Sequence, residues 1–129
     1  MLQIRKESRS ERKFLSDRDS EERRQMESEL AMPVYYYNWP AQMKNVVDRF
    51  YSYTGELTAM HKKTVMIAAA WDNTDSVFEI VTAYYKKLCD YMAFRDQGII
   101  EGRGCGSPGM TKRTRFMKEA YELGRTLKG

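Results

Sequence analysis

The chain has 129 residues, of which 42% are hydrophobic and 31% charged, and this length and composition suit one soluble domain with a single buried core. No apolar run approaches the ~20 residues of a membrane-spanning helix, and the first residues lack the apolar region of a secretory signal, so we expect a cytoplasmic protein that contacts no membrane. The net charge of +4 comes without a dense basic cluster apart from Lys112, Arg113 and Arg115, which argues against nucleic acid as a partner.

Residues 1–29 differ from the rest of the chain. They contain 16 charged side chains, eight of each sign, and their few apolar residues do not recur at helical spacing. Such a segment can form a helix but cannot bury a continuous face. We therefore expect a solvated helix or a disordered arm over 1–29, and a folded domain over 30–129.

Strand and helix signals alternate from residue 30 onward. Leu30–Tyr37 is apolar and aromatic, which predicts a short strand that runs into a loop at Pro33. Pro40 suits the first position of a helix, where its missing N–H costs nothing. The face of this helix that we expect to be buried consists of Met43, Val46, Val47 and Phe50, at i, i+3, i+4 and i+7.

The run from Lys63 to Trp71 is continuously apolar and predicts a strand that is buried on both faces, as in a parallel sheet. Ser76 and Glu79 have the spacing of a capping box for the long helix that follows. The predicted buried face of this helix is Val77, Val81, Tyr84, Leu88 and Met92.

Residues 98–105, which contain several glycines, predict a third strand. A final helix then begins after Thr111 or Thr114, either of which can cap it, and its predicted buried face is Phe116, Ala120, Leu123 and Leu127. The basic group Lys112, Arg113 and Arg115 near its start either solvates the helix or attracts a cofactor that bears a phosphate.

This alternation predicts an α/β domain of three layers, with parallel strands near 30–36, 63–70 and 98–105 and helices on the sheet.

Residues with metal or thiol chemistry are few. The cysteines Cys89 and Cys105 lack CxxC spacing, and the single histidine, His61, cannot build a metal site alone. We predict no metal site, and we expect Cys89 to be a small buried hydrophobe.

Residues 32–53 read MPVYYYNWPAQMKNVVDRFYSY and resemble a diagnostic stretch of the NAD(P)H-dependent FMN reductases, which are flavodoxin-like proteins. In that family a strand ends in a Ser/Thr-Pro-Val-Tyr turn, and a helix with Asp-Arg-Phe follows. The matching residues here are Pro33, Val34, Tyr35, Asn38, Pro40, Gln42, Lys44, Asp48, Arg49 and Phe50. The C-terminal part is also similar to the family, through the runs GRGCGSPGM (102–110) and FMKEAYELGRTL (116–127).

The resemblance implies a flavodoxin-like fold and an oxidoreductase that passes hydride from NAD(P)H through FMN to a quinone-type or other small acceptor. It implies cofactor contacts from two loops at strand ends. These residues are Pro33, Val34, Tyr35, Tyr36, Tyr37, Asn38, Trp39, Ala70, Trp71 and Asp72. The alternative for the three tyrosines is that they are core aromatics of a half-buried strand. No catalytic side chain is expected, because the protein supplies orientation and electrostatics to a flavin.

The chain departs from the family pattern at its beginning. Nothing in residues 1–31 resembles the Gly-Ser-Pro-Arg-type loop that holds the FMN phosphate, and the second strand of the family has no counterpart. We interpret the chain as an N-terminally truncated member with an incomplete flavodoxin-like fold. Two functions remain open: the FMN-dependent oxidoreductase, or a non-catalytic remnant that serves as an oligomerisation or interaction module without FMN.

The same departure predicts an exposed sheet edge. In the flavodoxin-like strand order 2-1-3-4-5, the strand near residue 30 would pair with a first strand that has no counterpart here. The residues Val34 to Tyr37 are uncharged, without the lysines that protect natural edges. We therefore expect a homo-oligomer, as the family resemblance also implies.

Overall fold

The computed structural model describes residues 28–127, and the predicted arm over 1–29 lies almost entirely outside the described residues. Strands and connecting helices follow one another along the chain. The strands are β1 (Ser28–Pro33), β2 (Lys63–Ala69) and β3 (Arg95–Gly102). The α-helices are α2 (Ala41–Asp48), α3 (Thr54–Met60), α4 (Glu79–Met92), α5 (Pro108–Lys112) and α6 (Phe116–Leu127), and the short 3-10 helices are η1 (Arg49–Tyr53) and η2 (Asp75–Phe78).

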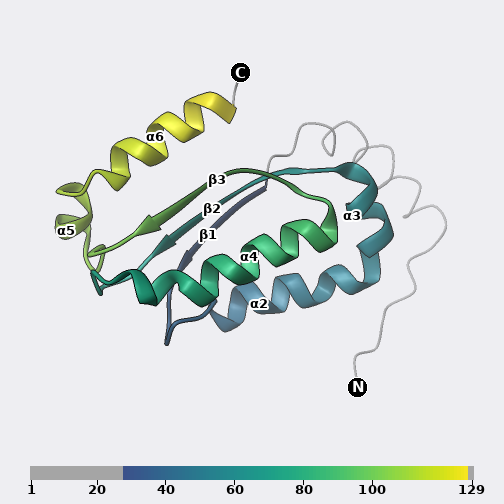
Figure 1. Ribbon diagram of the computed structural model, residues 1–129, viewed down its shortest axis with the longest axis horizontal. Coiled ribbons are helices and arrows are strands. Elements are labelled where there is room, and N and C mark those ends of the chain that lie inside the picture. Colours follow the sequence, from purple (N-terminus) through teal and green to yellow (C-terminus); the bar gives the residue numbers. More distant parts are fainter. Residues whose placement is uncertain (1–27, 128–129) are drawn as a thin grey trace.

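The three strands form one parallel sheet in the order β1-β2-β3, so the predicted α/β fold with a parallel sheet is confirmed. Leu30 pairs with Met66, and Ile67 pairs with Ile100. Helices α2 and α4 lie on one side of the sheet and α6 on the other, which gives three layers (Figure 1).

The boundaries of β1 and β3 differ from the prediction, and β3 ends at Gly102 and not near residue 105. β1 ends at Pro33 and not near residue 36, because Tyr35 and Asn38 pair with each other and leave the sheet. β3 begins at Arg95, three residues before the predicted start at 98. Its polar first residues join the sheet through a bulge: Thr64 pairs with Asp96 and Val65 with Gly98, so Gln97 is an extra residue on β3.

The core lies between β2 and α4. Met66 and Ala68 of β2 are fully buried, and they pack in one cluster with Phe78, Val81 and Tyr85. The predicted face of α4 is confirmed for four residues, while Tyr84 is only half-buried. The sequence did not indicate Phe78 and Tyr85. Cys89 is buried as expected.

Three local expectations are wrong. Ser76 and Glu79 do not form a capping box, because η2 occupies Asp75–Phe78 and α4 starts at Glu79. Val46 on α2 is 50% exposed, and Val47 is the one residue of that helix that is fully buried. Neither predicted threonine caps α6 in the hydrogen bonds of the described residues: Thr114 Oγ1 donates to Thr111 O at 2.7 Å, and Ser107 caps the preceding α5.

The face of the sheet under α6 is only partly covered. The predicted apolar face of α6 points to the sheet, yet its residues are half-buried and none is fully buried. The reason is that α6 packs mainly on β3. On the same face, Ala31 and Pro33 of β1 are exposed, and Ile67 and Ala69 of β2 are half-buried.

Candidate functional site

The carboxyl ends of the three strands meet at one edge of the sheet, and a loop follows each strand there (Figure 1). The loops are residues 34–40, residues 70–74 and residues 103–107. In open parallel α/β sheets, ligands bind in the crevice outside this edge. The loops contain every residue predicted to contact a flavin except Pro33, which is the last residue of β1.

A tight turn formed by Tyr35–Asn38, here named the tyrosine turn, follows β1. The Tyr35 N–H donates to the Asn38 carbonyl at 3.2 Å, and the Asn38 N–H donates back at 3.1 Å. Between them, Tyr36 has φ 49° and Tyr37 has φ 66°. This left-handed backbone costs a residue with a Cβ roughly 1–2 kcal/mol. Two adjacent strained residues in a loop point to a functional constraint.

The rings of the tyrosine turn face solvent. Tyr36 is 98% exposed, and Tyr35 and Tyr37 are each more than half exposed. The alternative interpretation of these residues as core aromatics is therefore wrong. Within residues 28–127, the N–H groups of Tyr36 and Tyr37 take part in no hydrogen bond, so they remain available as donors.

Asn38 and Trp39 hold the turn in place from below. The Asn38 side-chain oxygen accepts from the Trp39 N–H at 2.8 Å. Trp39 is 6% exposed, and its Nε1–H donates to the Val81 carbonyl on α4 at 3.1 Å. Its ring meets Tyr84 edge to face, with 4.8 Å between centroids. Trp39 thus anchors the loop in the core and presents no free face to a ligand.

The loops after β2 and β3 are joined into one unit by backbone hydrogen bonds. The Ala70 N–H donates to the Gly102 carbonyl at 3.0 Å, and the Ala70 carbonyl accepts from Cys105 N–H at 2.8 Å. The Asp72 carbonyl accepts from Gly104 N–H at 3.1 Å. The Asp72 carboxylate accepts from Thr74 N–H, also within the loop, at 3.0 Å. Ala70 is buried and both of its backbone groups are used in these hydrogen bonds, so its role is to hold the loops together.

Trp71 is the exposed aromatic residue of this unit, at 71% exposure. Its indole lies directly against Gly106, where a Cβ would fall 1.9 Å from Trp71 Cε3. Only glycine at position 106 allows this arrangement. The edge of the sheet therefore offers four exposed aromatic rings, three from the tyrosine turn and one from Trp71.

Arg103 supports the third loop through contacts that the sequence pattern did not reveal. Its Nη2 donates to Glu101 Oε2 at 2.9 Å, its Nε lies 2.5 Å from Asp75 Oδ1 in an ion pair, and its guanidinium stacks 5.6 Å from the Phe78 ring centroid. The Thr82 hydroxyl donates to the other oxygen of Glu101 at 2.9 Å. The only local signal was the alternation of charge with glycine in residues 101–106.

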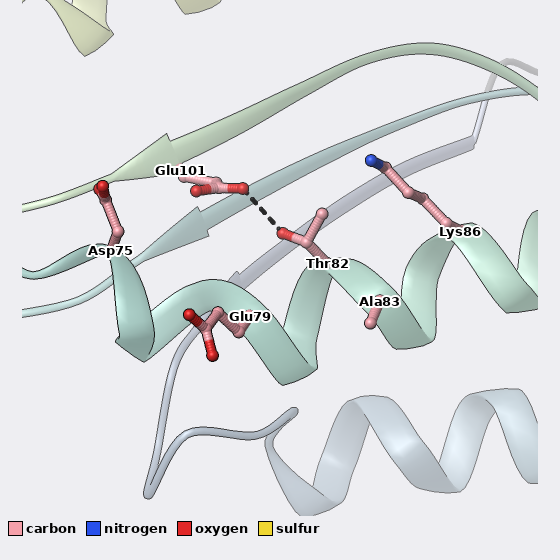
Figure 2. Close-up of a pocket in the computed structure, with 6 residues that line it drawn as sticks. All are labelled: Asp75, Glu79, Thr82, Ala83, Lys86 and Glu101. Carbon is pink, nitrogen blue, oxygen red and sulfur yellow. Dashed lines mark hydrogen bonds between the residues drawn. The ribbon is translucent and has the colours of Figure 1, made fainter.

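Figure 2 shows the open groove beside this cluster. The groove has a volume of about 380 Å³ and is lined by Asp75, Glu79, Thr82, Ala83, Lys86 and Glu101. Two of its three carboxylates are already paired with Arg103. The groove is formed by η2, α4 and β3 and includes no residue of the tyrosine turn, and we assign no ligand to it.

Other chemistry is sparse in the described part of the chain. No group of three or more histidine, cysteine or carboxylate side chains there is arranged to hold a metal ion. None of the helices over residues 28–127 combines the length and apolar character needed to cross a membrane. Cys105 is a half-buried free thiol near Thr114, at 4.0 Å. Lys112, the last residue of α5, and Arg113, which follows it, are both exposed. Helix α5 lies at the same end of the sheet as the three loops (Figure 1).

No protein-family model matches the chain, and no curated protein matches it. Among solved structures, the fold is similar to that of the Trp repressor binding protein from Bacillus subtilis, with a TM-score of 0.61 and 19% sequence identity. The aligned part covers 84% of this chain and 72% of that chain. The fold is a partial flavodoxin-like one. At this identity the likeness is one of fold and does not extend to activity.

Proposed function

We propose that this chain binds a flavin ring between the tyrosine turn and the Trp71 loop, and that it acts as an FMN-dependent NAD(P)H oxidoreductase. The observation that supports this most directly is the strained turn at Tyr36 and Tyr37, which displays aromatic rings at the carboxyl edge of a parallel sheet. The general preference of open parallel α/β sheets for ligands at this edge also supports the proposal.

The residues of the two loops have complementary roles toward a planar ring. The tyrosines and Trp71 offer faces for stacking, which is worth about 0.5–1.5 kcal/mol per aromatic pair beyond buried area. The N–H groups of Tyr36 and Tyr37, which take part in no hydrogen bond within residues 28–127, would donate to carbonyl oxygens on the polar edge of the ring. The buried anchors Trp39 and Ala70 fix both loops, so little order has to be gained on binding.

The described residues fit the ring of the cofactor better than its phosphate. Lys112 and Arg113 lie at the correct end of the sheet, but both are exposed, so their attraction for a phosphate is screened. A bound flavin would supply hydride acceptance from NAD(P)H and electron transfer to a quinone-type or other small acceptor. The side chains orient that ring and shield one of its faces, and we assign no proton transfer to any of them.

A flavin titration of the full chain tests the proposal. We expect FMN to bind, and Tyr36→Ala to weaken binding about five- to tenfold through lost stacking. Tyr51→Ala is the matched control, because Tyr51 is 90% exposed on η1 and lies outside the three loops. Tyr35→Ala and Asn38→Ala should also weaken binding. Absence of FMN binding by the wild type, or equal effects of the variants at 36 and 51, would reject the site.

Riboflavin separates recognition of the ring from recognition of the phosphate. If the two loops dominate binding, riboflavin should bind within about threefold of FMN. A preference for FMN above about a hundredfold would mean that another part of the chain supplies strong phosphate contacts.

A non-catalytic interaction module is the second candidate function. The observation in its favour is the partly bare sheet face under α6, where Ala31 and Pro33 are exposed. A colourless protein that takes up neither FMN nor riboflavin would favour this candidate.

A further inference from the structure

The backbone N–H and C=O groups of β1 point alternately toward β2 and toward the free edge of the sheet. Val34 N–H donates to the Ala69 carbonyl at 2.8 Å, so the Val34 backbone faces β2. Successive residues of a strand direct their backbone groups to alternate sides. The backbone groups of Glu29, Ala31 and Pro33 therefore point away from β2, and none of the strands in the described chain pairs with them.

The two edges of the sheet differ in protection. β3, at one edge, includes the bulge at Gln97 and charged residues such as Arg95, Asp96 and Glu101, which are devices that discourage pairing with another chain. β1, at the other edge, runs in uninterrupted register with β2 and has no bulge, and its protective residues are only Glu29 and Pro33, on either side of Ala31. The β1 edge is therefore the less protected of the two.

We propose that the β1 edge pairs antiparallel with β1 of a second copy of the chain, around a twofold axis at Ala31. In this register Ala31 exchanges two backbone hydrogen bonds with the partner's Ala31. Glu29 N–H then donates to the carbonyl of the partner's Pro33. Proline has no N–H to donate, so a register that uses only its carbonyl suits it.

Charge supports a second copy as the occupant. Glu29 is the only charged residue of the outward row, and the twofold register places it opposite Pro33 and not opposite another Glu29. By contrast, the sequence of residues 1–27 holds 15 charged side chains and no continuous apolar run that would favour a strand. The inference concerns assembly and does not depend on flavin binding.

Sedimentation equilibrium of the full chain tests the pairing. We expect a dimer of twice 15.2 kDa at micromolar concentration. Ala31→Pro removes only the outward N–H and leaves the β1–β2 ladder intact, and it should raise the dimer dissociation constant at least about tenfold. Ala31→Ser, which keeps the N–H, is the matched control and should remain dimeric. Ala31→Lys, which should also dissociate the dimer, serves as a second variant if circular dichroism shows that Ala31→Pro is unfolded.

Amide exchange identifies the surface directly, because Ala31 N–H should exchange more slowly as protein concentration rises. A monomeric wild type, an oligomer larger than a dimer, or a dimer that persists in both Ala31→Pro and Ala31→Lys would overturn the proposal. A monomer in which Ala31 is protected would do so as well, since another part of the same chain would then cover the edge.

Discussion

Trp71 lies against Gly106 so closely that no other residue fits at position 106 without moving the indole: a Cβ would fall 1.9 Å from Trp71 Cε3 and 2.5 Å from Cδ2. Because Trp71 is 71% exposed, it can swing into solvent. Gly106→Ala should therefore cost less than about 1 kcal/mol of stability, while it displaces a ring of the proposed flavin site. Gly109, where an added Cβ meets nothing within 4 Å, provides the control Gly109→Ala.

Fluorescence can follow this displacement, because the chain has only two tryptophans and Trp39 is buried. We expect acrylamide quenching and the emission maximum to change in Gly106→Ala and to stay unchanged in Gly109→Ala. If both variants have the emission of the wild type, the indole does not rest on Gly106 in solution.

The tyrosine turn should show a conflict between stability and binding. Tyr36 and Tyr37 occupy left-handed backbone that Asn and Gly adopt with less strain. Replacing the pair with Asn-Gly should raise the free energy of unfolding by about 1 kcal/mol. The same change removes two exposed rings and should weaken flavin binding. Urea unfolding measured beside a flavin titration provides both values, and a loss of stability would show that the turn is not strained.

A buried polar network predicts loss of stability at alkaline pH. Cys89 lies 3.5 Å from Thr64 Oγ1, which lies 3.0 Å from the Tyr85 hydroxyl, and Tyr85 donates to Asp96 at 3.1 Å. Burial raises the pKa of the Cys89 thiol, although its contact with Thr64 lowers it in part. Burial also raises the pKa of Tyr85 above its usual range.

The direction follows from linkage. A raised folded pKa means that the unfolded state loses its proton first, so the stabilisation is complete below the unfolded pKa and declines as pH rises toward the folded one. The free energy of unfolding should therefore fall from about pH 8.5 upward, first through Cys89 and then, from about pH 10, through Tyr85. Cys89→Ser, which does not titrate, should remove the first part of the fall in urea unfolding measured under reducing conditions. An unchanged slope in that variant would exclude Cys89 as the cause.

The contact between Gly98 and Leu123 tests how α6 is held. A Cβ on Gly98 would fall 2.8 Å from Leu123 Cδ1. Gly98→Ala should cost about 1 kcal/mol, and Leu123→Ala about 1–2 kcal/mol because Leu123 is half-buried. In the double variant the smaller side chain makes room for the new methyl group. The loss of stability in the double variant should therefore be about 0.5–1 kcal/mol smaller than the sum of the two single losses, measured by thermal or urea unfolding. Full additivity would mean that α6 does not rest on Gly98.

The sequence predicted the structure best where the local residue types alone determine it. The apolar run of β2 favours a strand, and the structure confirms the strand from Lys63 to Ala69. Its burial is complete only on the face toward α4, because Ile67 and Ala69 on the other face are half-buried. It predicted the structure worst where a side chain is positioned by a residue far away in the sequence. Trp39 belongs to a loop with the pattern of a flavin site, yet the Val81 carbonyl, 42 positions away, draws its ring into the core. The residues around Trp39 therefore give no indication that its ring is buried.

In the candidate site, too, the features that depend on distant residues or on backbone strain could not be predicted. The exposure of Tyr35–Tyr37 could not be settled from composition, since three tyrosines suit either a core or a surface. The turn that exposes them depends on positive φ at two residues whose identities do not favour it. The Arg103 cluster was missed because its partners, Asp75 and Thr82, come from η2 and α4 and meet Arg103 or Glu101 only once α4 packs on the sheet.

The order of the strands in the sheet is their order along the chain, and this affects how the protein is made. Each new strand adds beside the one synthesised just before it, so none has to insert between strands that are already paired. β1 and β2 can associate as soon as α3 has been translated and Lys63–Ala69 has left the ribosome. The sheet can therefore assemble progressively during translation, one strand–helix unit after another.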